Sequence, residues 1–119
     1  SNHLHLICSS NKGNLSGTIR DFKRHTSVEI LKAIEQNERE SRRNWMLWIF
    51  KKAGEKNKRN NNYQFWRQDN QAKELLPHQE SFAEQKLNYI HANPVEAGIV
   101  ENAEEYLYSS TMPFKVLSP

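Results

Sequence analysis

The opening segment of this sequence carries two histidines at a spacing that suits a metal site. His3 and His5 alternate with Leu4 and Leu6, so an extended backbone places both imidazoles on one face and both leucines on the other. Two adjacent imidazoles on a rigid strand form half of a metal site. A pair of surface histidines has the same pattern, and the spacing alone does not distinguish the two interpretations.

A second candidate group lies far downstream, in a segment with helical periodicity. Tyr89 and Asn93 are one helical turn apart and therefore share a face. Leu87 and Ile90 belong to the neighbouring apolar face, which we expect to dock on a sheet. Tyr89 then lies at the margin of the buried face. An amphipathic core tyrosine with its hydroxyl in solvent fits this position as well.

Two helices are expected in the first half of the chain. Apolar residues at helical spacing predict a helix from Asn14 to about Asn37. A second helix is expected from a Ser41 cap to a Gly54 stop. It contains the apolar run Trp45–Phe50, in which Trp45, Trp48 and Phe50 are expected to be core residues; a buried strand is the alternative for this run.

A third helix is expected to carry Tyr89. Ser81 and Glu84 have capping-box spacing and predict its start. The residue before a proline disfavours helical geometry, so the helix should end near Ala92, with a short second turn from Pro94 to Gly98. The alternation at residues 3–8 predicts a strand, and Tyr63–Trp66 predicts another short strand. The segment after Ser110 is expected to be irregular.

Basic residues cluster in the first half of the chain, although the formal net charge is only +3. Clustered Lys and Arg side chains favour nucleic acid as the partner, and a solvated charged face is the alternative. The candidate phosphate contacts are Arg20, Lys23, Arg24, Arg42, Arg43, Lys51, Lys52, Lys56, Lys58 and Arg59. The aromatic residues Tyr63, Phe65 and Trp66 are candidates for stacking on unpaired bases. The remaining histidines, including His91, have no partner at ligand spacing and are expected to make surface or polar contacts.

Length and composition bound the class of protein. A chain of 119 residues, 36% hydrophobic and 26% charged, predicts one domain covering residues 1–119, with an irregular tail at 111–119. No apolar run approaches the roughly 20 residues that span a bilayer, so we expect a soluble cytoplasmic protein with no membrane partner. The only cysteine, Cys8, excludes an internal disulfide and a zinc site built from several thiolates.

Several segments together resemble a known family. The opening Asn2–Ile7, the segment Phe65–Gln68, the run Tyr89–Val100 and the triplet Tyr108–Ser110 are similar to the IS200-like transposase superfamily. These enzymes use an HUH histidine pair, where U is a bulky hydrophobic residue, and a single tyrosine. The branch most similar to this chain is the group of REP-associated tyrosine transposases. The run Tyr89–Val100 carries most of the specificity of the resemblance.

The resemblance implies an activity and a role for each matching residue. It makes His3 and His5 the metal-binding and catalytic pair, with Leu4 between them, and Tyr89 the nucleophile. Asn93 matches the position of a third polar metal ligand for Mg²⁺ or Mn²⁺, which favour oxygen donors; with Glu96 it also fits an N-cap before Pro94. The implied enzyme cleaves and rejoins single-stranded or hairpin DNA through a 5′-phosphotyrosine intermediate. The sequence does not decide whether Lys86 or a water accepts the tyrosine proton, and a homodimer is compatible with it.

The family fold implied by the resemblance is α+β. It is an HUH-type α/β sandwich on an antiparallel sheet, of the ferredoxin or RRM type. Relatives usually have a strand and a helix before the HUH strand, which this chain lacks, so we expect a truncated and helix-rich version. Two further functions remain compatible with the sequence: a noncatalytic nucleic-acid-binding module using the same basic and aromatic surface, and a helical interaction domain with an incidental histidine pair.

Overall fold

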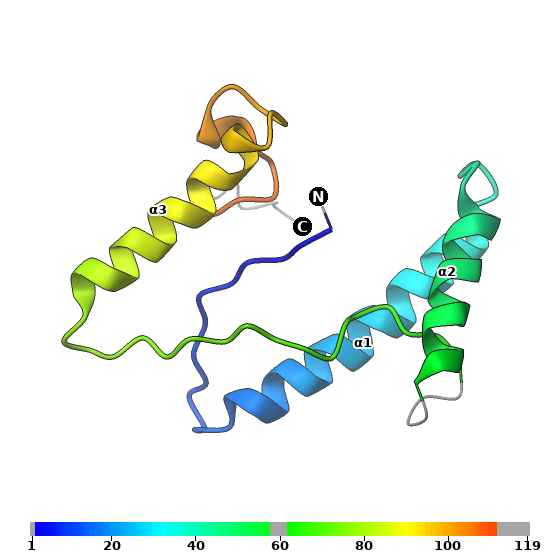
Figure 1. The fold of residues 1–119 in the computed structure, drawn as a ribbon, viewed down its shortest axis with the longest axis horizontal. Helices are drawn as coiled ribbons and strands as arrows, with labels where there is room; N and C mark the ends of the chain where they lie inside the picture. The colour runs from blue at the N-terminus through cyan, green and yellow to red at the C-terminus, as the bar shows by residue number, and fades with distance from the viewer. Residues whose placement is uncertain (1, 58–61, 112–119) are drawn as a thin grey trace, which may run out of the picture. The chain divides into compact units, whose positions relative to one another are not determined.

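The computed structural model describes residues 2–57 and 62–111, which form two compact units. The α1–α2 unit comprises residues 8–71, and the α3 unit combines residues 1–7 with residues 72–119. The elements, in chain order, are α1 (Leu15–Gln36), α2 (Arg43–Lys56), α3 (Glu80–Glu96) and the 3-10 helix η1 (Ala103–Glu105), shown in Figure 1. The Lys58 and Arg59 positions and most of the predicted tail lie outside the described residues.

Helix α1 confirms the first expected helix to within a residue at each end. Its N-cap is Asn14, whose side-chain oxygen accepts a hydrogen bond from the Gly17 amide at 3.0 Å. Although α1 has 22 residues, no helix within the described ranges is long and apolar enough to cross a membrane.

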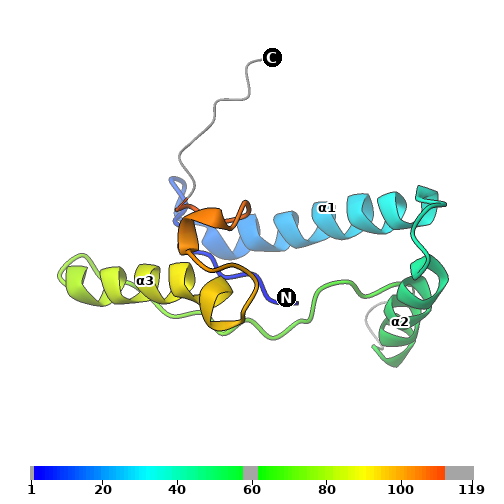
Figure 2. The same cartoon turned by 90° about the horizontal axis from the view of Figure 1, so that it is seen from above.

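Helix α2 follows a short connection from α1 (Figure 2) and is capped differently from the prediction. Its N-cap is Arg42, which makes no side-chain cap hydrogen bond, so the expected Ser41 cap is wrong. The Glu40 carboxylate instead accepts from the Arg42 amide at 2.9 Å and from the Arg42 Nε at 3.1 Å. Hydrogen bonds from the Arg42 side chain and backbone hold the pKa of Glu40 below its ordinary value.

Gly54 lies inside α2, which continues to Lys56, so its predicted role as a stop signal is wrong. The residue is buried, and a Cβ added there would clash with the backbone carbonyl of Asn62. The following chain therefore passes directly over the helix at this point. The Gln64 amide also donates to the Phe50 carbonyl at 2.9 Å. Gly54 permits close approach of two backbones rather than helix termination.

Aromatic rings hold the α1–α2 unit together. The Phe50 and Phe65 centroids are 5.0 Å apart, those of Phe65 and Trp66 are 5.1 Å apart, and those of Phe22 and Trp66 are 6.2 Å apart. The Trp66 indole N–H donates to the Thr26 hydroxyl at 2.9 Å. The segment after α2 is thereby fixed to both helices through ring contacts and a satisfied indole donor.

Two tryptophans of α2 do not join this packing. Trp45 is 60% exposed and Trp48 is 58% exposed, so their assignment to a core is wrong. No hydrophobic side chain within the described part of the chain is fully buried. A unit with two helices and one crossing segment has too little material to cover α2 on every side.

The predicted α/β sandwich on an antiparallel sheet is wrong for the described residues, which contain helices and no strand. Residues 3–8 and Tyr63–Trp66, where strands were expected, have no strand assignment. A strand exists only when a neighbouring segment pairs with its backbone N–H and C=O groups. Period-two alternation reports which side chains share a face, but it does not supply that partner.

Helix α3 starts at Glu80 after the N-cap Gln79, which makes no side-chain cap hydrogen bond, so the Ser81 capping box is wrong. The expected end near Ala92 is also wrong, because the helix continues through Pro94 to Glu96. Pro94 lies in the last turn and is buried. Its missing N–H removes one helical hydrogen bond there.

A Schellman motif ends α3 and accounts for its extension past the proline. The Gly98 amide donates to the Val95 carbonyl and the Ile99 amide donates to the Pro94 carbonyl, both at 2.9 Å. Gly98 has φ of 68°, the left-handed conformation that this motif needs and that glycine adopts without strain. These bonds satisfy carbonyls of the last turn and lead the chain back towards η1.

The 3-10 helix η1 is held by a carboxylate. Glu105 accepts from the amides of Glu101 at 3.2 Å and Asn102 at 3.1 Å, and from the Asn102 side-chain amide at 3.0 Å. The Asn102 side-chain hydrogen bond, together with these backbone hydrogen bonds, lowers the pKa of Glu105. This network fixes the segment that precedes Tyr106.

Candidate active site in the α3 unit

The α3 unit encloses a cavity of about 490 Å³ between residues 3–7, the second half of α3 and the segment that follows η1. Its lining includes His3, Leu4, His5, Leu6, Ile7, Leu87, Ile90, Asn93, Pro94, Ile99, Tyr106, Tyr108, Ser109 and Ser110. Apolar side chains from α3 and from the N-terminal segment form much of the wall. The face of α3 that was expected to dock on a sheet faces this cavity instead.

The two histidines of the N-terminal segment lie side by side at the cavity. Their ring centroids are 6.3 Å apart and their planes differ by 12°. Both side chains are exposed, and the His3 Nδ1 lies 2.6 Å from the Asn2 Oδ1. The alternation of residues 3–6 thus keeps both imidazoles on one side of the segment even though no strand forms.

Tyr89 lies against this histidine pair. Its ring centroid is 5.9 Å from that of His5, and the planes are nearly perpendicular at 86°. Tyr89 is 52% exposed, so part of the side chain is open to solvent and to a ligand. The structure therefore brings together an N-terminal histidine and a tyrosine of α3 that are distant in sequence.

Asn93, one turn after Tyr89, completes the polar part of the cavity. Its backbone carbonyl accepts from the Ala97 amide at 2.9 Å, so Asn93 is a helical residue and its interpretation as an N-cap is wrong. Its side-chain amide has no hydrogen-bond partner among residues 2–57 and 62–111. An amide oxygen that lines a cavity without a protein partner is available to a ligand.

The donor set of the cavity is compatible with a divalent cation. His3, His5 and Asn93 line the same space and offer two imidazole nitrogens and one amide oxygen. Such mixed nitrogen and oxygen donors suit Mn²⁺ and, with additional water or phosphate oxygens, Mg²⁺. Within the described ranges, no group of three or more His, Cys, Asp and Glu side chains is placed to hold a metal. A metal here would therefore depend on the amide and on oxygen atoms from water or a ligand.

Lys86 is placed one turn before Tyr89 but is engaged elsewhere. Its ammonium group lies 5.1 Å from the centroid of the Phe82 ring, within the range of a cation–π interaction. This contact directs the ammonium group towards the preceding turn of α3.

Tyr106, Tyr108 and Ser110 also border the cavity, and the sequence assigned them no chemical role. The His91 Nε2 lies 2.7 Å from the Ser110 hydroxyl, which confirms a polar contact for this histidine. Tyr108 is 85% exposed. The only sequence signal for this segment was the Tyr108–Ser110 triplet that contributes to the family resemblance.

The predicted phosphate contacts belong to the α1–α2 unit, and five of the eight that the structure describes are already paired. Salt bridges of 3.0 to 3.1 Å join Arg20 to Asp21, Arg42 to Glu40 and Lys52 to Glu55. Other cations of the set donate to uncharged oxygens: Lys23 bonds to the Arg67 carbonyl and the Asn70 side chain, and Arg43 bonds to the Glu35 carbonyl.

Three predicted phosphate contacts remain exposed and unpaired within the described residues: Arg24, Lys51 and Lys56. Of the predicted stacking residues, Phe65 and Trp66 are half-buried in the aromatic packing described above, whereas Tyr63 is exposed. Exposed cations without an acidic neighbour attract phosphate more strongly than paired ones.

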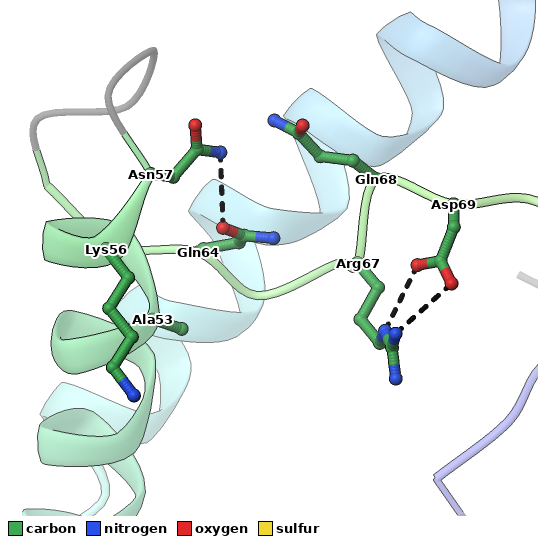
Figure 3. A pocket seen from close by; sticks show the side chains of 7 residues that line it. All are labelled: Ala53, Lys56, Asn57, Gln64, Arg67, Gln68 and Asp69. Carbon is green, nitrogen blue, oxygen red and sulfur yellow. Dashed lines mark hydrogen bonds and ion pairs between the residues drawn. The ribbon is translucent and has the colours of Figure 1, made fainter.

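A shallow hollow of about 360 Å³ lies beside the end of α2 (Figure 3). The Asn57 amide donates to the Gln64 side-chain oxygen at 3.3 Å, and the Arg67 guanidinium bonds to both Asp69 oxygens at 3.1 and 3.2 Å. Hydrogen bonds from its own backbone and from Arg67 lower the pKa of Asp69. Lys56 is the unpaired cation of this hollow, because Asp69 already neutralises Arg67.

Comparisons with known proteins do not assign this chain to a group. A scan of family models, a search of curated proteins and a search of solved structures each returned no match.

Proposed function

We propose that the α3 unit is the catalytic part of a metal-dependent enzyme that cleaves and rejoins single-stranded DNA through a 5′-phosphotyrosine intermediate. The observation that carries the proposal is the contact of the His5 ring with the Tyr89 ring beside a cavity that His3, His5 and Asn93 line together. The sequence resemblance to single-tyrosine HUH transposases assigns roles to these same four residues.

The reaction requires a nucleophile with access to a phosphodiester. Tyr89 is half exposed, and its oxygen would attack phosphorus in line with the leaving 3′ oxygen. The new bond joins the tyrosine oxygen to phosphorus, and the phosphorus–O3′ bond breaks. The tyrosine proton passes to solvent water and the 3′ oxygen gains a proton, so the products are a 5′-phosphotyrosine and a free 3′-hydroxyl. A later 3′-hydroxyl can reverse the step, because the phosphodiester bond energy is kept in the ester.

His3, His5 and Asn93 would hold the cation and place the phosphate beside Tyr89. When bound, a divalent cation offsets the charge that develops on the nonbridging phosphate oxygens. The edge-on contact between His5 and Tyr89 restricts the tyrosine ring to one side of the histidine pair. Holding the ring next to the phosphate raises the rate by orienting the reacting atoms.

The test is formation of a covalent protein–DNA adduct. The full chain is incubated with hairpin oligonucleotides carrying single-stranded flanks, in Mg²⁺ or Mn²⁺, and adducts are counted on denaturing gels. Tyr89→Phe should abolish the adduct while DNA affinity stays within about twofold. Tyr63→Phe, which removes a hydroxyl from an exposed tyrosine of the other unit, is the matched control and should leave the adduct intact. Undiminished adduct formation by Tyr89→Phe would refute the nucleophile assignment.

A noncatalytic nucleic-acid-binding module is the second candidate function. The observation in its favour is the exposed set Arg24, Lys51 and Lys56, which needs no active site to bind phosphate. Salt-dependent DNA binding by the wild-type chain, with no adduct in either metal, would favour this function over the enzyme.

A further inference from the structure

Tyr108 is an exposed aromatic side chain at the cavity that contains the candidate active site. It is 85% exposed and lines this cavity together with His3, His5 and Asn93. An aromatic ring with so little covering contributes little to folding through burial. Its position in the same cavity lining as the metal-ligand candidates indicates a role in holding a ligand.

The segment that carries Tyr108 is fixed by polar bonds. The Ser109 amide donates to the Tyr106 carbonyl at 3.1 Å, and the Thr111 hydroxyl donates to the Ala103 carbonyl at 2.8 Å. The Ser110 hydroxyl lies 2.7 Å from the His91 Nε2 of α3. The backbone of Tyr108 therefore lies in a turn that the Tyr106–Ser109 hydrogen bond closes, while its side chain stays open.

The Tyr106 ring contacts the Tyr108 ring. The two centroids are 5.8 Å apart and the planes make an angle of 76°, an edge-to-face arrangement. One such contact covers at most one face of Tyr108, so at least one face stays open to another flat group. A ring that is held by one neighbour and has an open face has the geometry of a stacking platform.

We propose that Tyr108 stacks on the unpaired base of the nucleotide next to the scissile phosphate. The inference rests on the proposed function, because it places that phosphate near Tyr89 and the histidine pair. A cavity of about 490 Å³ is in the size class of a small-molecule site, about 300–1,000 Å³, and its mixed lining suits a nucleotide with one flat apolar and one charged part. Base–aromatic stacking tolerates any base, so this contact would position the strand without selecting its sequence.

The test measures stacking separately from cleavage. A hairpin DNA with 2-aminopurine at successive positions of its single-stranded flank is bound in a Tyr89→Phe background, where no covalent step occurs. We expect quenching of 2-aminopurine at one position next to the cleavage site. Tyr108→Ala and Tyr108→Leu should both abolish that quenching and weaken binding about five- to 150-fold, whereas Tyr108→Phe should retain both. Leu keeps the apolar bulk but has no aromatic face.

Leu107→Ala is the control, because Leu107 is 70% exposed, adjacent to Tyr108 and absent from the cavity lining. It should leave quenching unchanged. Quenching that survives Tyr108→Ala and Tyr108→Leu would overturn the stacking proposal, even if the wild-type chain forms the covalent adduct. Burial of Tyr108 against a protein partner in the DNA-free state would overturn it as well. Loss of quenching in both variants supports stacking even if no adduct is ever found, so the two proposals fail separately.

Discussion

The aromatic residues of the two units have opposite environments. In the α1–α2 unit, Phe50, Phe65 and Trp66 contact one another, and the indole N–H has a hydroxyl partner. In the α3 unit, Tyr89 and Tyr108 are exposed: Tyr108 lines a cavity that His3 and His5 also line, and Tyr89 contacts His5. Aromatic rings that pack against one another stabilise a fold, whereas exposed rings beside polar side chains are available to a ligand.

The comparison changes how the predicted stacking residues are ranked. Phe65 and Trp66 were selected from the sequence because they are aromatic and follow a basic stretch. Their packing gives them a structural role, and Tyr108, for which no function was predicted, has the more accessible ring. The predictions below test this division between a structural and a ligand-binding set of aromatic and charged side chains.

The largest expected effect on adduct formation comes from substituting a histidine of the His3–His5 pair. His5→Ala should slow adduct formation by about 10²-fold or more, because it removes both a proposed metal ligand and the ring that contacts Tyr89. Initial rates of adduct formation in Mn²⁺ measure this effect. His25→Ala, an exposed histidine of α1, is the matched control and should have no effect. Equal rates for His5→Ala and the wild type would remove the histidine pair from the proposed site.

Trp66→Ala should lower the free energy of unfolding by about 2–3 kcal/mol, because it deletes contacts with Phe22 and Phe65 and leaves the Thr26 hydroxyl without its donor. Urea denaturation followed by circular dichroism measures the change. Trp45→Ala deletes the same type of side chain at an exposed position and should cost less than about 0.5 kcal/mol. Similar losses of unfolding free energy for the two variants would contradict the division into packed and exposed rings.

A smaller effect is expected from single exposed cations. Lys51→Ala should reduce the slope of log affinity against log salt for single-stranded DNA by about 0.7, the change for one lost phosphate contact. Fluorescence anisotropy across a salt titration measures the slope. Lys52→Ala should change it less, because Glu55 already pairs with Lys52 at 3.1 Å. If Lys52→Ala changes the salt slope more than Lys51→Ala does, ion pairing in the DNA-free chain does not determine which lysine contacts phosphate more strongly.

The smallest expected effect is a pH dependence of the hydrogen bonds that the Glu105 carboxylate accepts at η1. Hydrogen bonds from Asn102 and Glu101 lower the pKa of Glu105, so the fold favours its carboxylate. The stabilisation is present above the ordinary glutamate pKa of about 4.3 and is lost as the pH falls through the lower folded value. The Glu101 and Asn102 amides should then lose protection at acidic pH, measured by NMR as exchange rates relative to the intrinsic rate at each pH. Glu105→Gln should remove this pH dependence, and an unchanged dependence would assign it to another group.

Helix positions were predictable from the sequence, but helix ends were not. Helical periodicity located α1, whereas α2 was located from its apolar run and expected cap and stop signals, and α3 from capping-box spacing. The Ser41 and Ser81 caps failed because a serine at a favourable position need not make the cap bond. Helix α3 passes Pro94 because the Schellman motif around Gly98 satisfies carbonyls of its last turn. Such choices depend on contacts that local propensity does not contain.

Strand pairing and burial were less predictable still. Alternation correctly placed the imidazoles of His3 and His5 on one side, but a sheet needs a partner segment that no local pattern supplies. Trp45 and Trp48 were assigned to a core from their apolar neighbours, and both are exposed. The proximity of His5 to Tyr89 could not be obtained from spacing either, and only the family resemblance indicated it.

The most direct test of the central claim is to identify the residue that carries the DNA. The wild-type chain is incubated with a hairpin oligonucleotide in Mn²⁺, and the covalent product is digested with nuclease and protease for peptide mass spectrometry. Our account predicts a 5′-linked nucleotide on the peptide that contains Tyr89, with none on the peptides of Tyr63, Tyr106 or Tyr108. A nucleotide on any of those three tyrosines, or no covalent product in either Mn²⁺ or Mg²⁺, would contradict it.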